Sequence, residues 1–404
     1  MNTFYPILKV KADRAPSVVF RHPWLFSGAF EKIPHDLEHG TLVHVADPEG
    51  KMLGTGTFSK KSSIAVRVFE FGATEITKDW LKDRIEKAHK KRLLVGYGPK
   101  TQTTGYRVVF AEADSLPGLV VDRYDEVLVI QISTAGVEKL KPLILEALQE
   151  LFKPVSIIER SDLGVREEEG MKSEVNVLFW QAPETIEFLE NGYTFFADVM
   201  QGQKTGFFLD QKDLRAALQP LADGKEVLNL FSYTGATNVY AFKGGAKSVH
   251  CVDSSELALA GCEKNLKLNR LGSKKCTTEL ADVFQWLNDH KEPTYDMVLI
   301  DPPAIIKNKK DSEEGKKAYH FLNRAALRLV RDGGIFVTSS CSHFFSEEDF
   351  LFMLRRASVQ SNLELDILKR VHQSPDHPIS AYFPESAYLK SFIGVVRRRM
   401  SFDP

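Results

Sequence analysis

Two short segments in the C-terminal half of the sequence place a reactive side chain in a distinctive setting. Asp301 is followed by Pro302 and Pro303, which fix the backbone beside the acid. Cys341 stands between Ser340 and Ser342, after an apolar run and not within it. A cysteine in such a position acts as a nucleophile when nearby cations or backbone donors stabilise its thiolate. The sequence therefore predicts that Cys341 is a nucleophile and that Asp301 is a carboxyl group of the same site.

The other three cysteines carry no such signal. Cysteine is also a common buried small hydrophobe, and this interpretation suits Cys276 and Cys251, which lies inside an expected strand between His250 and Val252. Cys262 falls on an expected helix and has no functional interpretation. The four cysteines show neither a C-x-x-C pair nor zinc-ligand spacing, so no metal site is predicted, and their arrangement fits a reducing cytoplasm.

The element that must position these residues begins at Glu226. An apolar run from Val227 to Leu230 predicts a buried strand, Ser232–Gly235 a tight turn, and 238–243 a short helix ended by two glycines. A second strand over 248–252 is closed by Asp253. This βαβ pattern is half of a doubly wound nucleotide-binding sheet.

The turn after the first strand restricts the ligand. It has one glycine, Gly235, where the dinucleotide fingerprint has three, so a pyrophosphate does not fit against it. Gly235 would let the backbone approach a ligand closely, and Asp253 is placed to accept hydrogen bonds from both hydroxyls of a ribose. A ligand with a ribose but no phosphate fits these features, and S-adenosylmethionine is such a ligand.

The remaining strands continue the sheet. A third strand over 276–280 precedes Asp282, which is placed either to accept a hydrogen bond from an adenine amino group or to cap a helix. A fourth strand, 295–300, ends at Asp301, and a fifth, 335–338, leads to Cys341. Ligands of open α/β sheets bind beyond the carboxyl ends of the strands, so Asp301 and Cys341 should face one crevice. Strand–helix alternation from 226 onward predicts a mainly parallel sheet with helices on both faces.

Length and composition set the wider frame. A chain of 404 residues predicts two or three domains, and we expect a small β domain over 1–72, a small α/β domain over 73–187 and the doubly wound domain over 188–404. A net charge of −1 means that any nucleic-acid surface must be local. We see no signal peptide and no stretch of membrane-spanning length. A basic loop, 307–310, is either a lid over a polyanionic substrate or a solvated loop.

A cysteine beside a methyl donor has a specific use. Carbon 5 of a pyrimidine is a poor nucleophile, but thiolate attack on carbon 6 converts the ring into an enamine whose carbon 5 accepts a methyl group. A base then removes the carbon-5 proton, and the thiol is eliminated. Asp301 is placed to stabilise the intermediate near ring nitrogen 3.

These segments also carry a resemblance to a known family. They resemble motifs of the PUA-domain-containing, S-adenosylmethionine-dependent methyltransferases that form 5-methylcytosine in large-subunit ribosomal RNA. The matching segments are Arg21–Gly28, Glu112–Asp122, Lys204–Gly206, Phe231–Gly235, Val252–Asp253, Asp301–Pro303 and Ser340–Ser342. The resemblance covers nearly the whole chain. Differences fall on the expected substrate side, where Ala236, Ile305 and Ala318–Asn323 replace the usual family residues.

The resemblance implies a PUA-like RNA-binding β barrel at the N-terminus, S-adenosylmethionine as cofactor and large-subunit ribosomal RNA as partner. It also implies a cytoplasmic protein without membrane contact, and we further expect a homodimer. Cys341 and Asp301 would be catalytic. The implied cofactor-binding residues are Phe207, Asp210, Phe231, Tyr233, Gly235, Asp253, Ser254, Asp282 and Asp301.

Three alternative functions compete with this interpretation. A methyltransferase acting on a purine amino group would place an aromatic residue directly after Asp-Pro-Pro, where this chain has Ala304. An RNA-binding protein with an inactive methyltransferase domain is disfavoured by the intact turn, Asp253, Asp301 and Cys341. A nicotinamide dehydrogenase is disfavoured by the missing glycine fingerprint.

Overall fold

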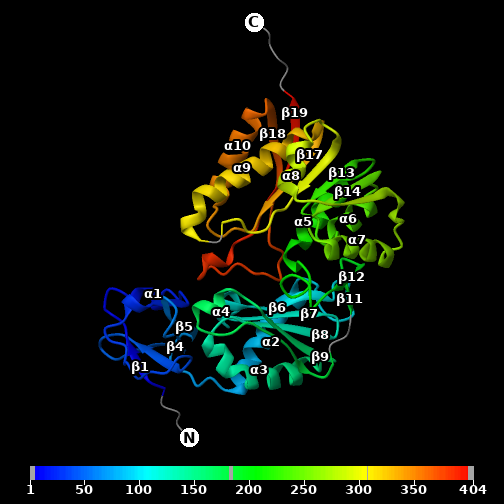
Figure 1. The fold of residues 1–404 in the computed structure, drawn as a ribbon. Helices are drawn as coiled ribbons and strands as arrows, with labels where there is room; N and C mark the ends of the chain where they lie inside the picture. The colour runs from blue at the N-terminus through cyan, green and yellow to red at the C-terminus, as the bar shows by residue number, and fades with distance from the viewer. Residues whose placement is uncertain (1–4, 182–184, 307, 399–404) are drawn as a thin grey trace. The chain divides into compact units, whose positions relative to one another are not determined.

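The computed structural model describes residues 5–181, 185–306 and 308–398, and the chain divides into two compact units. The first runs to Gly192 and adds Phe196–Leu209 and Pro375–Ser386. The second consists of Tyr193–Phe195, Asp210–Ser374 and the chain from Ala387 onward (Figure 1). The domain boundaries expected after residues 72 and 187 stay a prediction.

The first unit begins with a small β domain. Five strands lie in the order β1 (Ile7–Lys9), β3 (Leu42–Ala46), β4 (Met52–Phe58), β5 (Ile64–Glu70) and β2 (Trp24–Phe26). Strand β1 is parallel to β3 and the other pairs are antiparallel. Helix α1 (Ala15–Val19) packs beside β4, and alternate strand residues such as Val43, Val45, Val66 and Val68 form the core.

An α/β domain completes most of the first unit. Its sheet has the order β10 (Glu174–Phe179), β9 (Ser156–Ser161), β8 (Val127–Ile132), β7 (Leu119–Tyr124) and β6 (Gly105–Phe110). Helices α2 (Lys78–Leu94) and α3 (Ala135–Phe152) pack against each other beside it, and α4 (Val165–Glu168) is a single turn (Figure 1). Thr77 and Thr134 cap the two long helices by accepting hydrogen bonds from the backbone NH groups of Trp80 and Val137.

The second unit is built on a seven-stranded sheet. Its order is β15 (Cys276–Leu280), β14 (Ser248–Asp253), β13 (Glu226–Leu230), β16 (Tyr295–Ile300), β17 (Val330–Ser340), β19 (Lys390–Arg398) and β18 (Leu363–His372). The first five strands in this order pair in parallel, whereas β19 is antiparallel to β17 and β18. The predicted mainly parallel, doubly wound sheet is therefore confirmed. Chain order reverses between β13 and β16, which is the switch point where ligands of such sheets bind.

The last part of this sheet differs from the expectation. Strand β17 extends beyond 335–338 at both ends, β19 starts at Lys390, and β18 was not expected. Strand β18 is an edge strand with many charged, exposed residues, so its sequence lacks the continuous apolar run of the inner strands.

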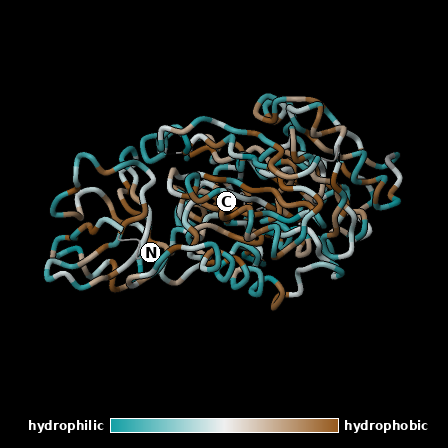
Figure 2. The backbone as a smooth tube through the Cα atoms, turned by 90° about the horizontal axis from the view of Figure 1, so that it is seen from below, coloured by the Kyte–Doolittle hydropathy of each residue, from teal (hydrophilic) through white to brown (hydrophobic). Residues whose placement is uncertain are grey.

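Helices cover both faces of the sheet. Helices α8 (Val283–Asp289), α9 (Ser312–Arg328) and α10 (Glu347–Gln360) share one apolar core with strand residues such as Leu228, Val298 and Phe336. Helices α5 (Lys212–Leu218), α6 (Ala236–Lys243) and α7 (Glu256–Leu268) pack in sequence, α6 on α5 and α7 on α6. Figure 2 shows brown, apolar strand segments in the interior and teal segments on outer helices and loops.

Short elements connect these layers. A hairpin of β11 (Ile186–Glu190) and β12 (Tyr193–Ala197) lies where the chain first passes between the two units. Single 3₁₀ turns occur at Ser27–Ala29, Ala111–Asp114, Leu209–Gln211, Gln219–Leu221, Ser273–Lys275, Lys309–Asp311 and Pro384–Ser386. Within the described ranges, none of the helices combines the length and apolar character needed to cross a bilayer.

The segment 375–386 lies between β18 and β19 in the sequence but packs in the first unit. The Arg92 guanidinium donates to the Asp376 carbonyl at 2.7 Å, and the Arg107 NH donates to the Asp376 carboxylate at 2.9 Å. The Phe383 ring packs edge-on against Trp24, with 4.7 Å between ring centroids. The first unit therefore includes a piece of chain from near the C-terminus.

Candidate active site

The turn after β13 carries an unusual backbone. Phe231, Tyr233 and Gly235 have φ angles of 57°, 46° and 64°, in the left-handed region. A Cβ atom on Gly235 would lie 2.5 Å from both Cys262 Sγ and Asn238 Nδ2. Glycine is thus required by packing of the turn against α6 and α7, a reason that differs from the expected close approach of a ligand.

Asp253, at the end of β14, holds this turn. Its carboxylate accepts hydrogen bonds from the Tyr233 NH at 2.8 Å and the Ser255 NH at 3.0 Å. Each carboxylate oxygen accepts more than one hydrogen bond, so ribose hydroxyls remain compatible with these contacts. The oriented carboxylate beside the switch point fits the nucleoside part of S-adenosylmethionine. The neighbouring Ser254 is exposed.

Asp282 follows β15 and caps α8. Its side chain accepts a hydrogen bond from the Gln285 NH at 3.0 Å. The capping interpretation is therefore confirmed, and because the side chain is exposed and has a second oxygen, a role toward an adenine amino group stays a prediction.

Phe231 lies at the edge of the apolar core of the second unit. Its ring packs edge-on against Phe284, with 6.4 Å between centroids. Phe207 belongs to the first unit, where it is buried against Phe188 with 5.0 Å between centroids. The predicted roles of both rings toward the cofactor stay predictions.

Asp210 is buried at the start of α5. Its carboxylate accepts a hydrogen bond from the Tyr388 hydroxyl at 2.5 Å, and its carbonyl accepts from the Ser374 NH at 2.9 Å. One residue further, the Gln211 side-chain amide donates to the Asp301 carboxylate. The segment 210–211 is therefore tied to the end of β16.

Asp301 and Cys341 follow neighbouring parallel strands. Ile300 of β16 pairs with Thr338 of β17, and both residues of interest come directly after these strands. The structure brings them to the same edge of the sheet, as the sequence predicts. Both side chains are half-buried.

A hydroxyl network fixes the loop that carries Cys341. The Ser340 hydroxyl donates to the Tyr319 hydroxyl at 3.0 Å, which lies 3.0 Å from Ser342 Oγ. Ser342 Oγ in turn accepts from the Ile306 NH at 3.1 Å, in the segment after Asp301. Burial raises the pKa of Tyr319 to about 12, and the Cys341 thiolate adds to the shift. Tyr319 therefore stays a neutral hydroxyl at physiological pH.

The structure adds a residue that sequence reasoning missed. Lys390 is buried on β19, opposite Ser340, and its ammonium donates to the carbonyls of Ser342 at 2.7 Å and Phe345 at 2.8 Å. In the sequence this residue is a lysine followed by Ser391 and an apolar run, a pattern that carries no signal for such a contact. His343, which is near Cys341 in the sequence, is exposed beside Phe344.

Cys251 and Cys276 lie on β14 and β15, whereas Cys262, on α7, donates to the Tyr233 carbonyl of the turn after β13 at 3.2 Å. Cys251 and Cys262 are buried, and Cys251 Sγ lies 3.8 Å from Cys276 Sγ. Contacts with Cys262 and Cys276, together with burial, raise the pKa of Cys251 well above its usual value. The predicted structural interpretation of Cys251 is consistent with this burial.

The Arg21–Gly28 motif lines a pocket in the N-terminal β domain. The pocket, of about 270 Å³, is bordered by Arg14, Ser17, Trp24, Leu25, Phe26, Gly28 and Ala29. Phe26 is 51% exposed at this pocket, and Phe20, elsewhere in the same domain, is 76% exposed. Trp24 is instead held inward by its indole NH, which donates to Glu112 at 2.8 Å.

The basic loop 307–310 was expected to be either a lid over a polyanionic substrate or a solvated loop, and its contacts fit both. Lys307 lies outside the described residues, Lys309 and Lys310 are exposed, and Asn308 caps the following turn by accepting from the Lys310 NH. Its role toward a polyanion stays a prediction.

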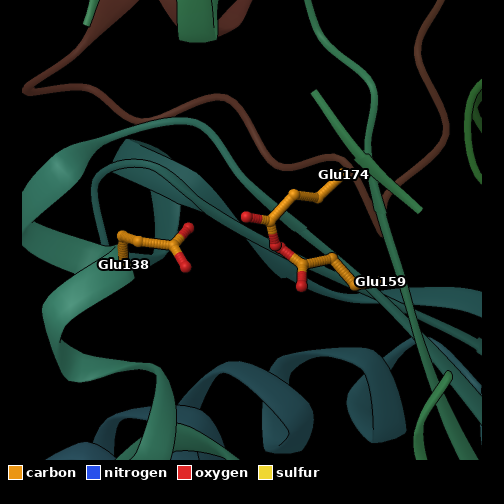
Figure 3. A group of neighbouring side chains, drawn as sticks. All are labelled: Glu138, Glu159 and Glu174. Atoms are coloured by element: carbon orange, nitrogen blue, oxygen red, sulfur yellow. The ribbon is translucent and has the colours of Figure 1, made fainter. Parts of the chain in front are cut away.

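An acidic cluster in the first unit is an ion-pair network. Carboxylates of Glu138, Glu159 and Glu174 converge within 4.8 Å from α3, β9 and β10 (Figure 3). The Lys141 ammonium contacts all three, and Arg166 lies 3.0 Å from Glu138. Burial lowers the pKa of Lys141, but its hydrogen bonds to Glu138 and Glu159 outweigh burial and raise the pKa. The lysine therefore stays charged, and the chain's own cations neutralise the three carboxylates.

Comparisons with known proteins agree with this architecture. A family model of a PUA-like domain matches residues 8–71, and a model of an S-adenosylmethionine-dependent methyltransferase matches residues 159–391. A solved candidate methyltransferase from Streptococcus mutans superposes with a TM-score of 0.82 at 23% identity, covering 96% of this chain and all of that one. A second solved candidate methyltransferase, in complex with S-adenosylhomocysteine, gives a TM-score of 0.83 at 24% identity, covering the same shares of both chains.

Curated relatives extend over nearly the full chain. A protein of Tolumonas auensis is 38% identical over 390 residues, which is 95% of this chain and 98% of the relative. A protein of Shewanella frigidimarina is 37% identical over 396 residues, 96% of this chain and 99% of the relative. Both are named ribosomal RNA large subunit methyltransferase I. S-adenosylmethionine is thus the cofactor, and the chain belongs to the S-adenosylmethionine-dependent methyltransferases, in the family of these PUA-domain relatives.

Proposed function

We propose that this chain methylates carbon 5 of a cytosine in large-subunit ribosomal RNA and that Cys341 forms a transient covalent bond to the base. The observation that carries the proposal is the position of Asp301 and Cys341 after neighbouring parallel strands, beside the strand ends that bear the turn and Asp253. The name shared by the relatives supports the class of RNA.

The chemistry explains why a cysteine is needed. When bound, S-adenosylmethionine supplies an electrophilic methyl group on a sulfonium, but carbon 5 of cytosine is too weak a nucleophile to accept it. A thiolate at Cys341 adds to carbon 6, which places electron density on carbon 5. Carbon 5 would then take the methyl group, and the donor would be left as a neutral thioether.

The covalent bond is released in a second step. A base removes the proton from carbon 5, the ring double bond re-forms, and the bond between carbon 6 and sulfur breaks to return the Cys341 thiolate. Cys341 is the half-buried thiol beside Asp301 among the described residues, so the same sulfur both attacks and leaves.

Asp301 acts at ring nitrogen 3 of the base, across the ring from carbon 6, where Cys341 attacks. A carboxyl group at ring nitrogen 3 stabilises, as a hydrogen-bond donor, the charge that thiolate attack places on the ring. The hydrogen bond that the Gln211 side-chain amide donates to one oxygen of Asp301 orients the carboxyl group before the base arrives.

The substrate must present an unstacked base. A thiolate and a methyl donor reach one pyrimidine from different sides only if the base has left its helix or lies in a single strand. The PUA-like domain, with Arg14 at the edge of its pocket and Phe20 and Phe26 exposed, offers a cation and two rings for such an RNA segment.

Replacement of the nucleophile tests the proposal. Cys341→Ala should bind cofactor and RNA normally yet transfer no methyl group from labelled S-adenosylmethionine. RNA carrying 5-fluorocytosine should be trapped covalently by the wild type, because fluorine cannot leave carbon 5 as a proton does. Peptide mapping should place the adduct on Cys341.

The other cysteines supply matched controls. Cys262→Ala and Cys276→Ala should still form the adduct. If Cys341→Ala continues to methylate, or if the adduct lies on another cysteine, methylation of a purine amino group guided by Asp301 becomes the leading account.

A further inference from the structure

Lys390 is the cation built into the loop that carries Cys341. Its side chain extends from β19 and donates to the carbonyls of Ser342 and Phe345, which fixes the backbone on the C-terminal side of the cysteine. Phe345 is itself buried between Tyr319 and Phe350, with centroid distances of 5.0 Å and 5.3 Å. The loop is therefore anchored in the core as well as to the lysine.

The charges around Lys390 favour an interaction with the thiol. Burial lowers the pKa of Lys390 to about 8, while the Cys341 thiolate and the Glu347 carboxylate oppose that change. At neutral pH the side chain is still mainly an ammonium.

Glu347, at the start of α10, has cations of its own. Its carboxylate lies 2.9 Å from an Arg370 nitrogen and 3.7 Å from a His372 nitrogen, both on β18. From α9, Tyr319 faces the cysteine as a neutral hydroxyl. Of the two anions that favour the ammonium form of Lys390, Glu347 thus shares its charge with these two cations, and Cys341 has the larger effect on Lys390.

We propose that Lys390 is a positioning residue that keeps Cys341 in its reactive thiolate form and fixes the loop in which it attacks. The inference rests on the proposed nucleophilic role of Cys341. It does not require Lys390 to touch the RNA or the cofactor. A buried positive charge beside a thiol increases the thiolate fraction near neutral pH, which is the form that attacks.

The pH dependence of Cys341 alkylation tests this role without cofactor or RNA. Iodoacetamide labelling of the full-length protein is followed by peptide mass spectrometry, with the Cys276 peptide as internal reference. In the wild type, the Cys341 rate should follow an apparent pKa below the ordinary thiol value of about 8.5. Lys390→Gln keeps NH donors for the two carbonyls but removes the charge, and should lower the rate at pH 7 about tenfold or more.

Two companion variants separate charge from structure. Lys390→Arg should restore the wild-type pH profile, whereas Lys390→Met should match or exceed the loss in Lys390→Gln. S-adenosylmethionine binding by calorimetry and thermal unfolding check that each variant is folded. A purely structural lysine would change unfolding but leave the pH profile where it was.

The outcomes separate this inference from the proposed function. An unshifted profile in folded Lys390→Gln, or a wild-type apparent pKa at or above about 8.5, overturns the role of Lys390 even if Cys341→Ala is inactive. If the pH profile of Cys341 alkylation is shifted in Lys390→Gln but Cys341→Ala still methylates RNA, the role of Lys390 toward Cys341 stands. The covalent mechanism is then overturned instead.

Discussion

At the scale of single residues, the carboxylates proposed to bind the cofactor also make contacts that serve the fold. Asp253 holds two backbone NH groups of the cofactor-side loops, and Asp282 caps α8. A carboxylate with several lone pairs is able to do both, so structural and ligand roles do not exclude each other. Variants that keep one role and remove the other are needed to separate them.

Asp253→Ala should weaken S-adenosylmethionine binding at least about 100-fold, because hydrogen bonds to a charged group contribute about 1.5–3 kcal/mol each. The fold should survive, since the side chain lies at the end of a strand and is only half-buried. Isothermal calorimetry measures the affinity and circular dichroism the fold. An unchanged affinity would remove the ribose assignment, and binding of NAD in place of S-adenosylmethionine would remove the cofactor assignment as a whole.

Asp282→Ser provides the matched comparison. Serine is as good an N-cap as aspartate, so the stability of α8 should be kept, while a lost contact to an adenine amino group should lower affinity about tenfold. Affinity equal to wild type in this variant would leave Asp282 with the capping role alone.

The elements were predictable where a buried apolar run ends in an acid or a glycine. Strands β13 to β16 fall within one residue of their expected ranges, and Asp253, Asp282 and Asp301 follow them as predicted. Strand β18 and the role of Lys390 were not predictable in this way, because antiparallel pairing with distant strands decides them. The network of Tyr319, Ser340 and Ser342 likewise depends on how α9 packs on the sheet.

The turn between β13 and α6 is where element packing is tightest. Gly235→Ala places a methyl group 2.5 Å from Cys262 Sγ at a φ of +64°. Strain and overpacking together should destabilise the protein by about 2–4 kcal/mol. Chemical denaturation measures the loss, and Gly164→Ala, where a Cβ meets nothing within 4 Å, is the neutral control.

Adding Cys262→Ala to Gly235→Ala measures how much of the loss in the free energy of unfolding comes from overpacking. The double variant should recover about 1–2 kcal/mol relative to the sum of the single changes, because removing the sulfur relieves the overlap with Cys262 but leaves the overlap with Asn238 and the backbone strain. Strict additivity would mean that the turn shifts away from α7 and that the contact is not the cause.

At the scale of the whole molecule, RNA binding and cofactor binding should be separable. The exposed rings of Phe20 and Phe26 lie in the N-terminal β domain, whereas the acids proposed for the nucleoside lie in the second unit. The chain has a net charge of −1, so its RNA contacts must come from local surfaces such as these.

The paired change Phe20→Ala with Phe26→Ala should weaken binding of large-subunit ribosomal RNA fragments about tenfold or more and leave S-adenosylmethionine affinity unchanged, because stacking contributes about 1–3 kcal/mol per base. Filter binding at several salt concentrations measures the effect. Leu94→Ala, at a side chain 87% exposed in the α/β domain, should leave RNA binding unchanged.

Deleting residues 1–72 should weaken RNA binding more strongly than the paired change and should also leave S-adenosylmethionine affinity unchanged. Tight, salt-insensitive RNA binding by the truncated protein would contradict the assignment.

The segment 375–386 has a consequence for how such proteins diverge. Its contacts with Trp24, Arg92 and Arg107 join this late segment of the chain to the first third of the sequence. A chimera that takes its N-terminal half from one relative and its C-terminal half from another would bring a foreign segment to those three residues. Substitutions at 376 and 383 are therefore expected to change together with substitutions at 24, 92 and 107, and recombination between relatives should succeed only when this short segment travels with the N-terminal domains.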